Sequence, residues 1–174
     1  MKISVFVLLW AISLTTYTQE VINWISIEEV QELVKNEPRK IIIMVYTDWC
    51  TYCQNMEATT FKDPEIIKYI NSHFYAVKLN AETKEPIIFK GRTYTNPQPD
   101  KEKSKHRLAL SFAAIDKTIG FPTFVFFDDN LNRLMSPIRG YKSKEKLEMY
   151  LQYIIQDIYK SKSFEEYRKT ITRK

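Results

Sequence analysis

Two cysteines are the residues of this chain best suited to chemistry, because they lie close together in the sequence. The segment that contains them reads Asp48-Trp49-Cys50-Thr51-Tyr52-Cys53, and the chain has no further cysteine. Two thiols at this spacing can close a disulfide with each other or give up both hydrogens. The pair is therefore the candidate redox site of the protein.

The residues before the pair indicate that it lies where a strand gives way to a helix. The run from Ile41 to Thr47 is apolar and β-branched, which is typical of a strand buried on both faces. We expect a helix to begin at Cys50, where free backbone N–H groups and the positive end of the helix dipole favour a thiolate. Cys50 is then the nucleophile, and Cys53, one turn further and more buried, is the resolving thiol.

Activation of Cys50 alone explains little of the expected reactivity. A fall in its pKa from ~8.5 to ~6.5 raises the thiolate fraction at about pH 7 roughly 25-fold. The more acidic thiolate is also about 8-fold less nucleophilic, so the net gain in reactivity is only about threefold. The larger benefits are a better leaving group at Cys50 and the proximity of Cys53. This proximity makes resolution of a mixed disulfide an intramolecular step.

Other interpretations of the pair stay open at this point. A structural disulfide across so short a loop would stabilise the fold by only ~2 kcal/mol. A zinc site needs two further ligands, and the only histidines, His73 and His106, have no recognised zinc spacing. Copper(I) delivery needs only two soft ligands and is the stronger metal alternative. The favoured interpretation requires no metal and no cofactor.

Composition and charge indicate the broad class of protein. The 174 residues are 44% hydrophobic and 14% aromatic, which is enough for one globular domain with a real core. The net charge is +5, but no Lys/Arg cluster is interleaved with aromatic residues. We therefore expect no nucleic-acid partner.

The first residues resemble an export signal. Met1-Lys2 provides a positive start, and Ile3 to Leu14 is an apolar stretch too short to span a bilayer comfortably. We predict a signal peptide over 1–19, with a single domain over 20–174; an uncleaved signal would be the only membrane attachment. The folded part should then face a periplasmic or other extracytoplasmic, thiol-oxidising space.

Capping residues and hydrophobic patterns predict the elements on either side of the pair. Ser26 and Glu29 form a capping box that opens a helix, and Asp63-Pro64 is typical of a second helix start. The predicted order of the first half is a short edge strand at 21–24, a helix to 36, a strand over 41–47, a helix over 50–60, a helix to 72 and a strand over 74–80.

The second half contains a long insertion, followed by a hairpin and helices. Residues 81–104 are polar and proline-bearing, with a possible small hairpin at 87–89 and 92–94; so long a loop is usually functional or mobile. The remaining predicted elements are a helix over 106–115, a strand over 122–128, a returning strand over 133–139, an amphipathic helix after Ser143 whose inner stripe runs from Leu147 to Ile158, and an extra helix over 163–172 opened by Ser163 and Glu166.

These residues resemble the thioredoxin superfamily, and more narrowly exported bacterial thioredoxin-like proteins with an insertion. The resemblance depends on Trp-Cys-x-x-Cys after an apolar strand, on Gly120-Phe121-Pro122-Thr123 before a later strand, and on Gly140, and it covers about 22–160. It implies an α/β thioredoxin fold, with a central mixed β-sheet flanked by helices on both faces. It also implies a cis peptide bond between Phe121 and Pro122, facing the cysteines.

The resemblance implies a substrate-binding surface around the pair, formed by Trp49, Thr51, Tyr52, Phe121 and Pro122. Backbone groups beside the proline could pair with an extended substrate strand. The sequence departs from the family in two ways. Met44 stands where many thioredoxins have a buried acid, so proton transfer to Cys53 must use water or another group. Thr51-Tyr52 replaces the familiar Gly-Pro, so no redox potential can be carried over.

The favoured hypothesis is an exported thiol–disulfide oxidoreductase that exchanges disulfides with protein substrates through Cys50 and Cys53. Within that class we favour a reductase supplied by a membrane electron donor. The alternatives are a copper(I)-delivery or passive protein-binding module on the same fold, and a folding helper that binds extended chains. Met44 and Trp24 are expected in the core, His73 at a helix end, and His106 at the surface or at a helix cap.

Overall fold

The computed structural model describes residues 20–171 of the chain. The predicted signal peptide over 1–19 and the last residue of the predicted final helix lie outside these residues. Within them, no helix is both long enough and apolar enough to cross a bilayer.

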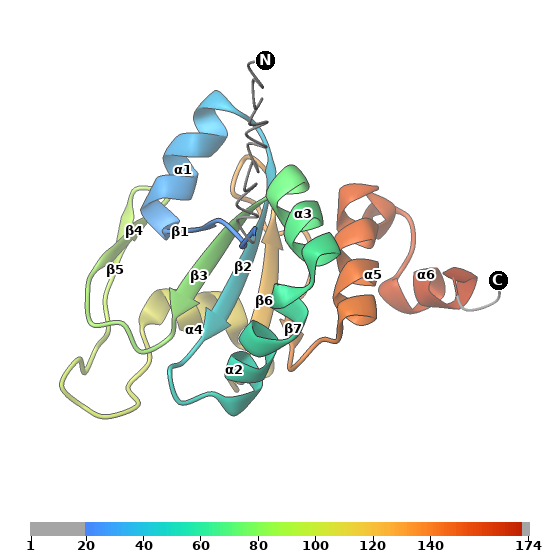
Figure 1. Cartoon of the computed structure of the whole chain (residues 1–174). Coiled ribbons are helices and arrows are strands. Elements are labelled where there is room, and N and C mark those ends of the chain that lie inside the picture. Colours follow the sequence, from blue (N-terminus) through green and yellow to red (C-terminus); the bar gives the residue numbers. More distant parts are fainter. Residues whose placement is uncertain (1–19, 172–174) are drawn as a thin grey trace, which may run out of the picture.

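A five-stranded mixed sheet forms the centre of the molecule (Figure 1). Its strand order is β1-β3-β2-β6-β7, in which β1, β3 and β2 run parallel while β6 and β7 are antiparallel to their neighbours. The mixed sheet predicted from the sequence is therefore confirmed. The bounds of the strands are β1 (Trp24–Ile25), β2 (Lys40–Tyr46), β3 (Phe74–Asn80), β6 (Thr123–Phe127) and β7 (Ile138–Arg139).

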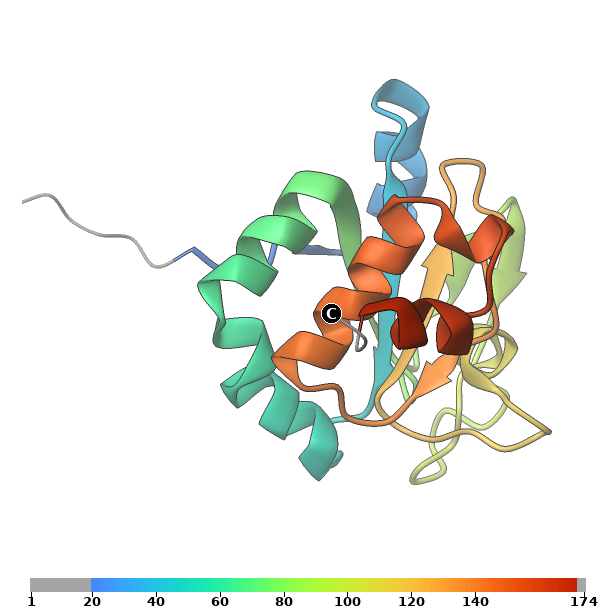
Figure 2. The same cartoon turned by 90° about the vertical axis from the view of Figure 1, so that its right-hand side faces the viewer.

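Helices cover both faces of the sheet, as predicted (Figures 1 and 2). One face packs against α2 (Thr51–Ala58), α3 (Pro64–His73) and α5 (Lys144–Ile155), and the final helix α6 (Phe164–Ile171) packs on α5. The other face packs against α1 (Ile27–Asn36), α4 (Arg107–Ala113) and a small hairpin, β4 (Ile87–Phe89) with β5 (Arg92–Tyr94).

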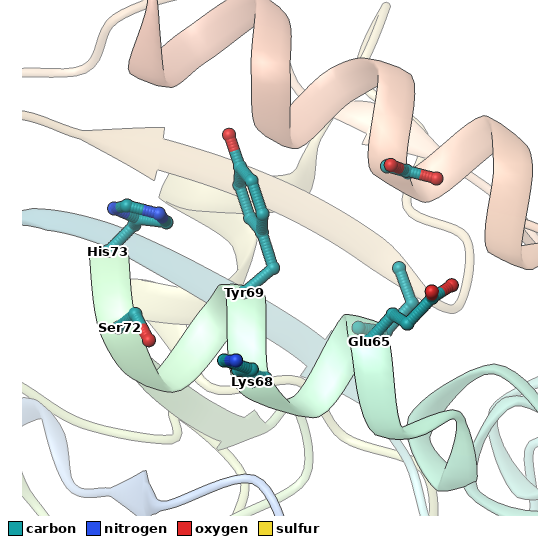
Figure 3. Close-up of a pocket in the computed structure, with 7 residues that line it drawn as sticks. Glu65, Lys68, Tyr69, Ser72 and His73 are labelled. Atoms are coloured by element: carbon teal, nitrogen blue, oxygen red, sulfur yellow. The ribbon is translucent and has the colours of Figure 1, made fainter.

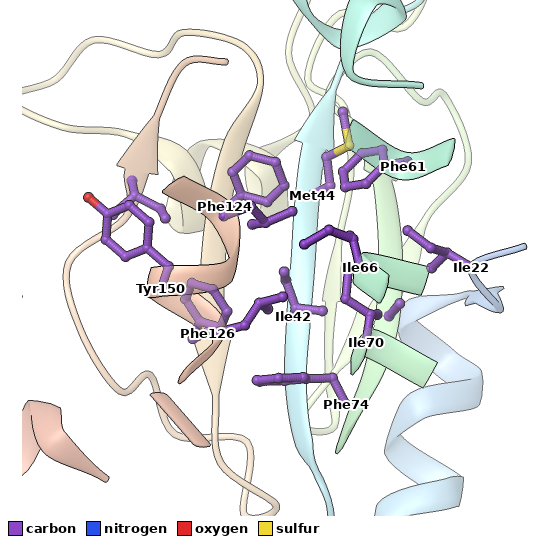
Figure 4. Packing of buried hydrophobic residues seen from close by; sticks show 14 of the residues in the cluster. Ile22, Ile42, Met44, Phe61, Ile66, Ile70, Phe74, Phe124, Phe126 and Tyr150 are labelled. Carbon is purple, nitrogen blue, oxygen red and sulfur yellow. The ribbon is translucent and has the colours of Figure 1, made fainter. Parts of the chain in front are cut away.

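The alternation of side chains along β2 explains the two hydrophobic cores. Ile42 and Met44 face the core that contains Phe124 and Phe126 (Figure 4). The alternate residues Ile41, Ile43 and Val45 face the core beneath α1. Because β2 is buried on both faces, its sequence is a continuous apolar run. Met44 is fully buried in the first core, so this position contributes packing and no titratable group.

Side-chain caps fix where the helices begin. The Ser26 hydroxyl accepts a hydrogen bond from the Glu29 N–H at 3.0 Å, and the Asp63 carboxylate accepts one from the Glu65 N–H at 2.9 Å. At the last helix, Ser163 and Glu166 cap each other's backbone N–H reciprocally. These starts agree with the sequence because a cap depends on residues within a single turn.

Two predicted elements are shorter than expected. Helix α5 ends at Ile155, and a short 3₁₀ turn at Ile158–Lys160 follows Asp157, which adopts a left-handed conformation with φ of 57°. Ile155 and Ile158 are consequently only partly buried. The returning strand over 133–139 is reduced to Ile138–Arg139, because Pro137 has no N–H to donate to a ladder.

The 81–104 insertion is irregular apart from one small hairpin, as the sequence indicated. The hairpin turns at Lys90-Gly91, where both residues have positive φ. Gln31 of α1 donates its amide to the Ile88 carbonyl at 2.8 Å and accepts the Lys90 N–H at 2.8 Å. The insertion is thereby attached to the face of the sheet that α1 covers.

Candidate active site

Cys50 is the N-cap residue of α2, which is the position predicted for the nucleophile. It forms a disulfide with Cys53, with a Cα–Cα distance of 5.2 Å. The Cys50 sulfur also accepts a hydrogen bond from the Cys53 N–H at 3.1 Å. In the reduced protein, this same N–H and the positive end of the α2 dipole favour a negative charge on Cys50. The helix start therefore provides the means to stabilise a thiolate.

The expected difference in burial between the two cysteines is small. Cys50 is 5% exposed and Cys53 is 3% exposed, so both lie at the edge of the core. The difference that matters is which sulfur a partner can reach. Cys50 lines a surface pocket and Cys53 does not, which agrees with an attacking Cys50 and a resolving Cys53.

The pocket beside Cys50 brings together most of the residues that the resemblance implied. Trp49 and Tyr52 on its rim are 51% and 65% exposed, respectively. Pro122 is buried just outside the pocket, and its peptide bond with Phe121 is cis. The lining residues are Trp49, Cys50, Thr51, Tyr52, Lys105, Ile119, Gly120 and Phe121.

Backbone groups in this pocket are available to a partner. The Pro122 carbonyl accepts the Gly140 N–H at 2.7 Å and is therefore occupied. In contrast, the backbone N–H and C=O of Phe121 have no hydrogen-bond partner within residues 20–171. An extended chain that enters the pocket could satisfy both groups.

Trp49 is held by residues that sequence reasoning did not identify. Its indole N–H donates to both carboxylate oxygens of Glu82, each at 3.0 Å, and its ring meets Phe121 edge-on with centroids 6.0 Å apart. The ammonium groups of Lys103 and Lys105 lie 5.6 and 5.4 Å from the indole centroid. Glu82 is the second residue of the 81–104 insertion and Lys105 directly follows it, so the signal for this pair is that the two ends of the insertion must meet.

Glu82 is ionised at neutral pH despite its partial burial. Burial alone would raise its pKa, but hydrogen bonds from Lys105 and Trp49, together with the charge on Lys105, hold the pKa below its ordinary value. Lys105 and Glu82 form an ion pair with both side chains mostly buried. The carboxylate is thus a fixed anchor for the indole.

A second ion pair, also missed from the sequence, lies one turn beyond Cys53. Glu57 of α2 lies 2.6 Å from the Lys78 ammonium, without the alignment of a hydrogen bond. Lys78 also lies over the rings of Trp24 and Tyr46, at 5.1 and 5.6 Å. Glu57 lies four residues after Cys53 in α2, so the two residues share a face of the helix.

The two histidines have structural roles, and neither lines the pocket beside Cys50. His106 caps α4, with Nδ1 accepting the Leu108 N–H at 3.3 Å and Nε2 3.1 Å from the Tyr94 carbonyl. Its burial, which the sequence did not predict, lowers its pKa and favours the neutral ring. His73 ends α3 and packs on Tyr69 in a separate pocket between α3 and α5 (Figure 3). Within residues 20–171, no three His, Cys, Asp or Glu side chains are grouped to hold a metal.

The fold and the site together define a thioredoxin-fold protein with a paired-cysteine centre at a helix start. The sequence profile of a family described as a thioredoxin-like domain matches residues 27–155. The chain belongs to this family. The topology, the cysteine positions and the predicted fold class all agree with that assignment.

Known relatives support thiol–disulfide chemistry for the pair. The thiol:disulfide interchange protein DsbD of Photorhabdus laumondii is 23% identical over 150 residues, which is 83% of this chain and 22% of that protein. The chain thus spans about a fifth of the length of the curated relatives it matches.

Solved structures support the fold. A thioredoxin-fold protein from Helicobacter pylori has a TM-score of 0.57 and 20% identity, over 78% of this chain and 81% of that chain. The DsbH oxidoreductase has a TM-score of 0.52 and 17% identity, over 88% of this chain and 95% of that chain.

Proposed function

We propose that this protein is an extracytoplasmic thiol–disulfide oxidoreductase that exchanges disulfides with protein substrates. The observation that carries the proposal is the position of Cys50: it caps α2, is paired with Cys53, and is the one of the two sulfurs that lines an open pocket. A structural disulfide does not require a pocket with unpaired backbone groups beside it. No bound cofactor takes part in this chemistry.

The reaction in the reducing direction has two exchange steps. The Cys50 thiolate attacks a substrate disulfide, forms a mixed disulfide and releases one substrate thiolate. Cys53, once deprotonated, attacks the Cys50 sulfur, closes the Cys50–Cys53 disulfide and releases the second substrate thiolate. Two electrons pass from the cysteine pair to the substrate. The reverse sequence oxidises a substrate dithiol.

The surface around Cys50 suits a polypeptide substrate. The rings of Trp49, Tyr52 and Phe121 provide apolar contact area, and the free N–H and C=O of Phe121 could pair with an extended segment. The roles of Thr51 and Pro122 in this surface are part of the same proposal.

We assign Glu57 as the group that accepts the proton of Cys53. It would take the role of the buried acid of many thioredoxins, where this chain has Met44. The basis for this assignment is that Glu57 and Cys53 are four residues apart on the same face of α2, and that a carboxylate can act as a general base directly or through a water. We expect Glu57→Gln to slow closure of the mixed disulfide by about tenfold near pH 7 and to shift its pH profile, while attack by Cys50 changes little. Stopped-flow measurement of the two steps checks this, with Glu65→Gln on α3 as the control. An unchanged pH profile would remove Glu57 from the mechanism.

The proposal also includes the direction of electron flow and the compartment in which the protein works. We favour a reductase in the periplasm or another extracytoplasmic space, supplied with electrons by a membrane protein. The support is the signal-like segment over 1–19 and the relatives named as thiol:disulfide interchange proteins. A reduction potential near about −270 mV is expected for a reductant, and one near about −120 mV would indicate an oxidant.

The test of the function is to trap its intermediate. Cys53→Ser should accumulate a mixed disulfide with a partner protein or glutathione through Cys50, detected by mass spectrometry and reversed by dithiothreitol. Cys50→Ser is the matched control and should trap nothing. If Cys53→Ser forms no adduct and Cys50 is alkylated no faster than in unfolded protein, the proposal fails. Stoichiometric retention of copper(I) without disulfide reduction would favour the metal-delivery alternative.

A further inference from the structure

The two ends of the 81–104 insertion meet beside the cysteine loop. The Ala81 N–H donates to the Tyr46 carbonyl at 2.8 Å, and the His106 N–H donates to the Ala81 carbonyl at 2.8 Å. Tyr46 is the last residue of β2, from which the chain continues to Cys50. The insertion is therefore anchored at the end of the sheet that carries the redox pair (Figure 1).

Glu82, at one end of the insertion, directs its carboxylate toward donors of the protein itself. Its carboxylate accepts hydrogen bonds from Trp49 and Lys105, and its N–H donates to the Asn80 side chain at 2.9 Å. Asp48, which directly precedes Trp49 in the sequence, accepts the Asn80 amide at 3.0 Å. The anion closest to the indole is therefore occupied by the protein's own donors.

Of the two cations at the other end of the insertion, Lys105 is paired with Glu82, and Lys103 is left to face a partner. Lys105 is the only charged residue among the described residues that line the pocket beside Cys50. The Lys103 side chain is 62% exposed, with its ammonium 5.6 Å from the Trp49 ring. Its acidic neighbour, Glu102, is 3.9 Å away and exposed, a pairing that contributes little in water.

We propose that this surface, an insertion rim formed by Trp49, Lys103 and Lys105, selects polypeptide disulfides that carry an acidic side chain next to the cysteine. The inference depends on the proposed function, because it concerns the partner of the same Cys50. An acidic side chain reaching past the indole meets the Lys103 ammonium, and apolar atoms beside it pack on Trp49. A basic side chain at the same place is repelled, and like-charge repulsion is an effective source of specificity.

The test compares two peptides in which one cysteine forms a mixed disulfide with glutathione. The peptides are identical except that two residues beside the cysteine are Asp in one and Lys in the other. The full chain, reduced beforehand with dithiothreitol, is mixed with each peptide under single-turnover conditions. We expect the acidic peptide to react about fivefold faster at low salt, and the preference to disappear at about 0.5 M NaCl.

Substitution of Lys103 identifies the source of the preference without disturbing a buried pair. Lys103→Gln should bring the ratio of the two rates close to one, and Lys103→Glu should reverse it. Lys35→Gln is the matched control, since the Lys35 side chain is 64% exposed and is also paired with a nearby glutamate, but lies on α1. This control should keep the wild-type ratio.

A small uncharged disulfide separates failure of this inference from failure of the function. If the wild-type protein reduces the uncharged disulfide but treats both peptides equally, the insertion rim is not a specificity surface and the proposed function stands. The same conclusion follows if Lys103→Glu leaves the ratio unchanged. If none of the three disulfides reacts, both proposals are overturned.

Discussion

Trp49 and Tyr52 flank Cys50 in the sequence and are both well exposed, at 51% and 65%, yet their surroundings differ. Trp49 is fixed by Glu82, by the edge of Phe121 and by two lysines. The side chain of Tyr52 has no hydrogen bond, ion pair or ring contact with any other residue of 20–171. Exposure alone therefore does not distinguish a positioned side chain from a mobile one.

The difference between these two residues originates outside the cysteine loop. The contacts of Trp49 come from residues at both ends of the insertion and from the segment before β6. A fixed aromatic side chain loses little conformational entropy when a partner binds, whereas a free one must be ordered at that moment. We therefore expect Trp49 to contribute more binding free energy than Tyr52, although Tyr52 is more exposed.

Removal of the Trp49 ring should have the largest effect. Trp49→Ala is expected to raise KM for a peptide disulfide about tenfold, because the partner loses a preformed aromatic contact worth roughly 1–2 kcal/mol. The effect on a small disulfide, which does not reach the indole, should be smaller. Steady-state kinetics with both substrates provide the measurement. Equal losses for the two substrates would mean that the indole supports the site rather than the partner.

Loss of the Glu82 charge should have an intermediate effect, visible as a pH dependence of stability. The pKa of Glu82 is lowered in the folded protein, since its hydrogen bonds from Lys105 and Trp49 outweigh its burial. Its contribution is therefore present above its unfolded pKa of about 4.3 and is lost as the pH falls through the lower folded value. Between pH 7 and about pH 3, wild-type protein should lose ~1 kcal/mol more stability than Glu82→Gln.

Urea unfolding at the two pH values measures this difference. Other carboxylates titrate alike in both proteins, so subtracting the two results isolates Glu82. Trp49 fluorescence, recorded in a background with both Trp10→Phe and Trp24→Phe, gives a second readout of whether the indole has been released. If wild type and Glu82→Gln lose the same stability on acidification, Glu82 does not anchor Trp49 through its charge.

The parts of this structure that were predictable from sequence are those determined locally. The apolar run of β2, the Ser26 cap and the Cys50 helix start each depend on neighbouring residues. The end of α5 was not predictable, because Lys40, far away in the sequence, donates to the Ile154 carbonyl at 2.6 Å and pairs with Asp157. That contact exists only once β2 and α5 are packed together.

The same limit applies to the candidate site. Trp49, Cys50, Tyr52 and Phe121 were predicted because they belong to two short motifs that the fold brings together. Glu82 and Lys105 were missed, since their pairing requires closure of the intervening chain, and no residue pattern specifies which loop charges will meet. A long insertion with a glutamate as its second residue and a lysine directly after its last residue is the sequence feature that pointed toward this contact.

Removal of the Tyr52 ring should have the smallest effect and is the sharpest test of the comparison. Tyr52→Ala should change kcat/KM for the same peptide by less than about twofold and stability by less than about 0.5 kcal/mol, because the ring gives up no contact in the free protein. Tyr52→Phe is the matched control, which keeps the ring and removes the hydroxyl. If Tyr52→Ala raises KM as much as Trp49→Ala, then the partner orders Tyr52 on binding at little cost. In that case the exposed area beside Cys50, and not anchoring by the insertion, determines how strongly a partner is held.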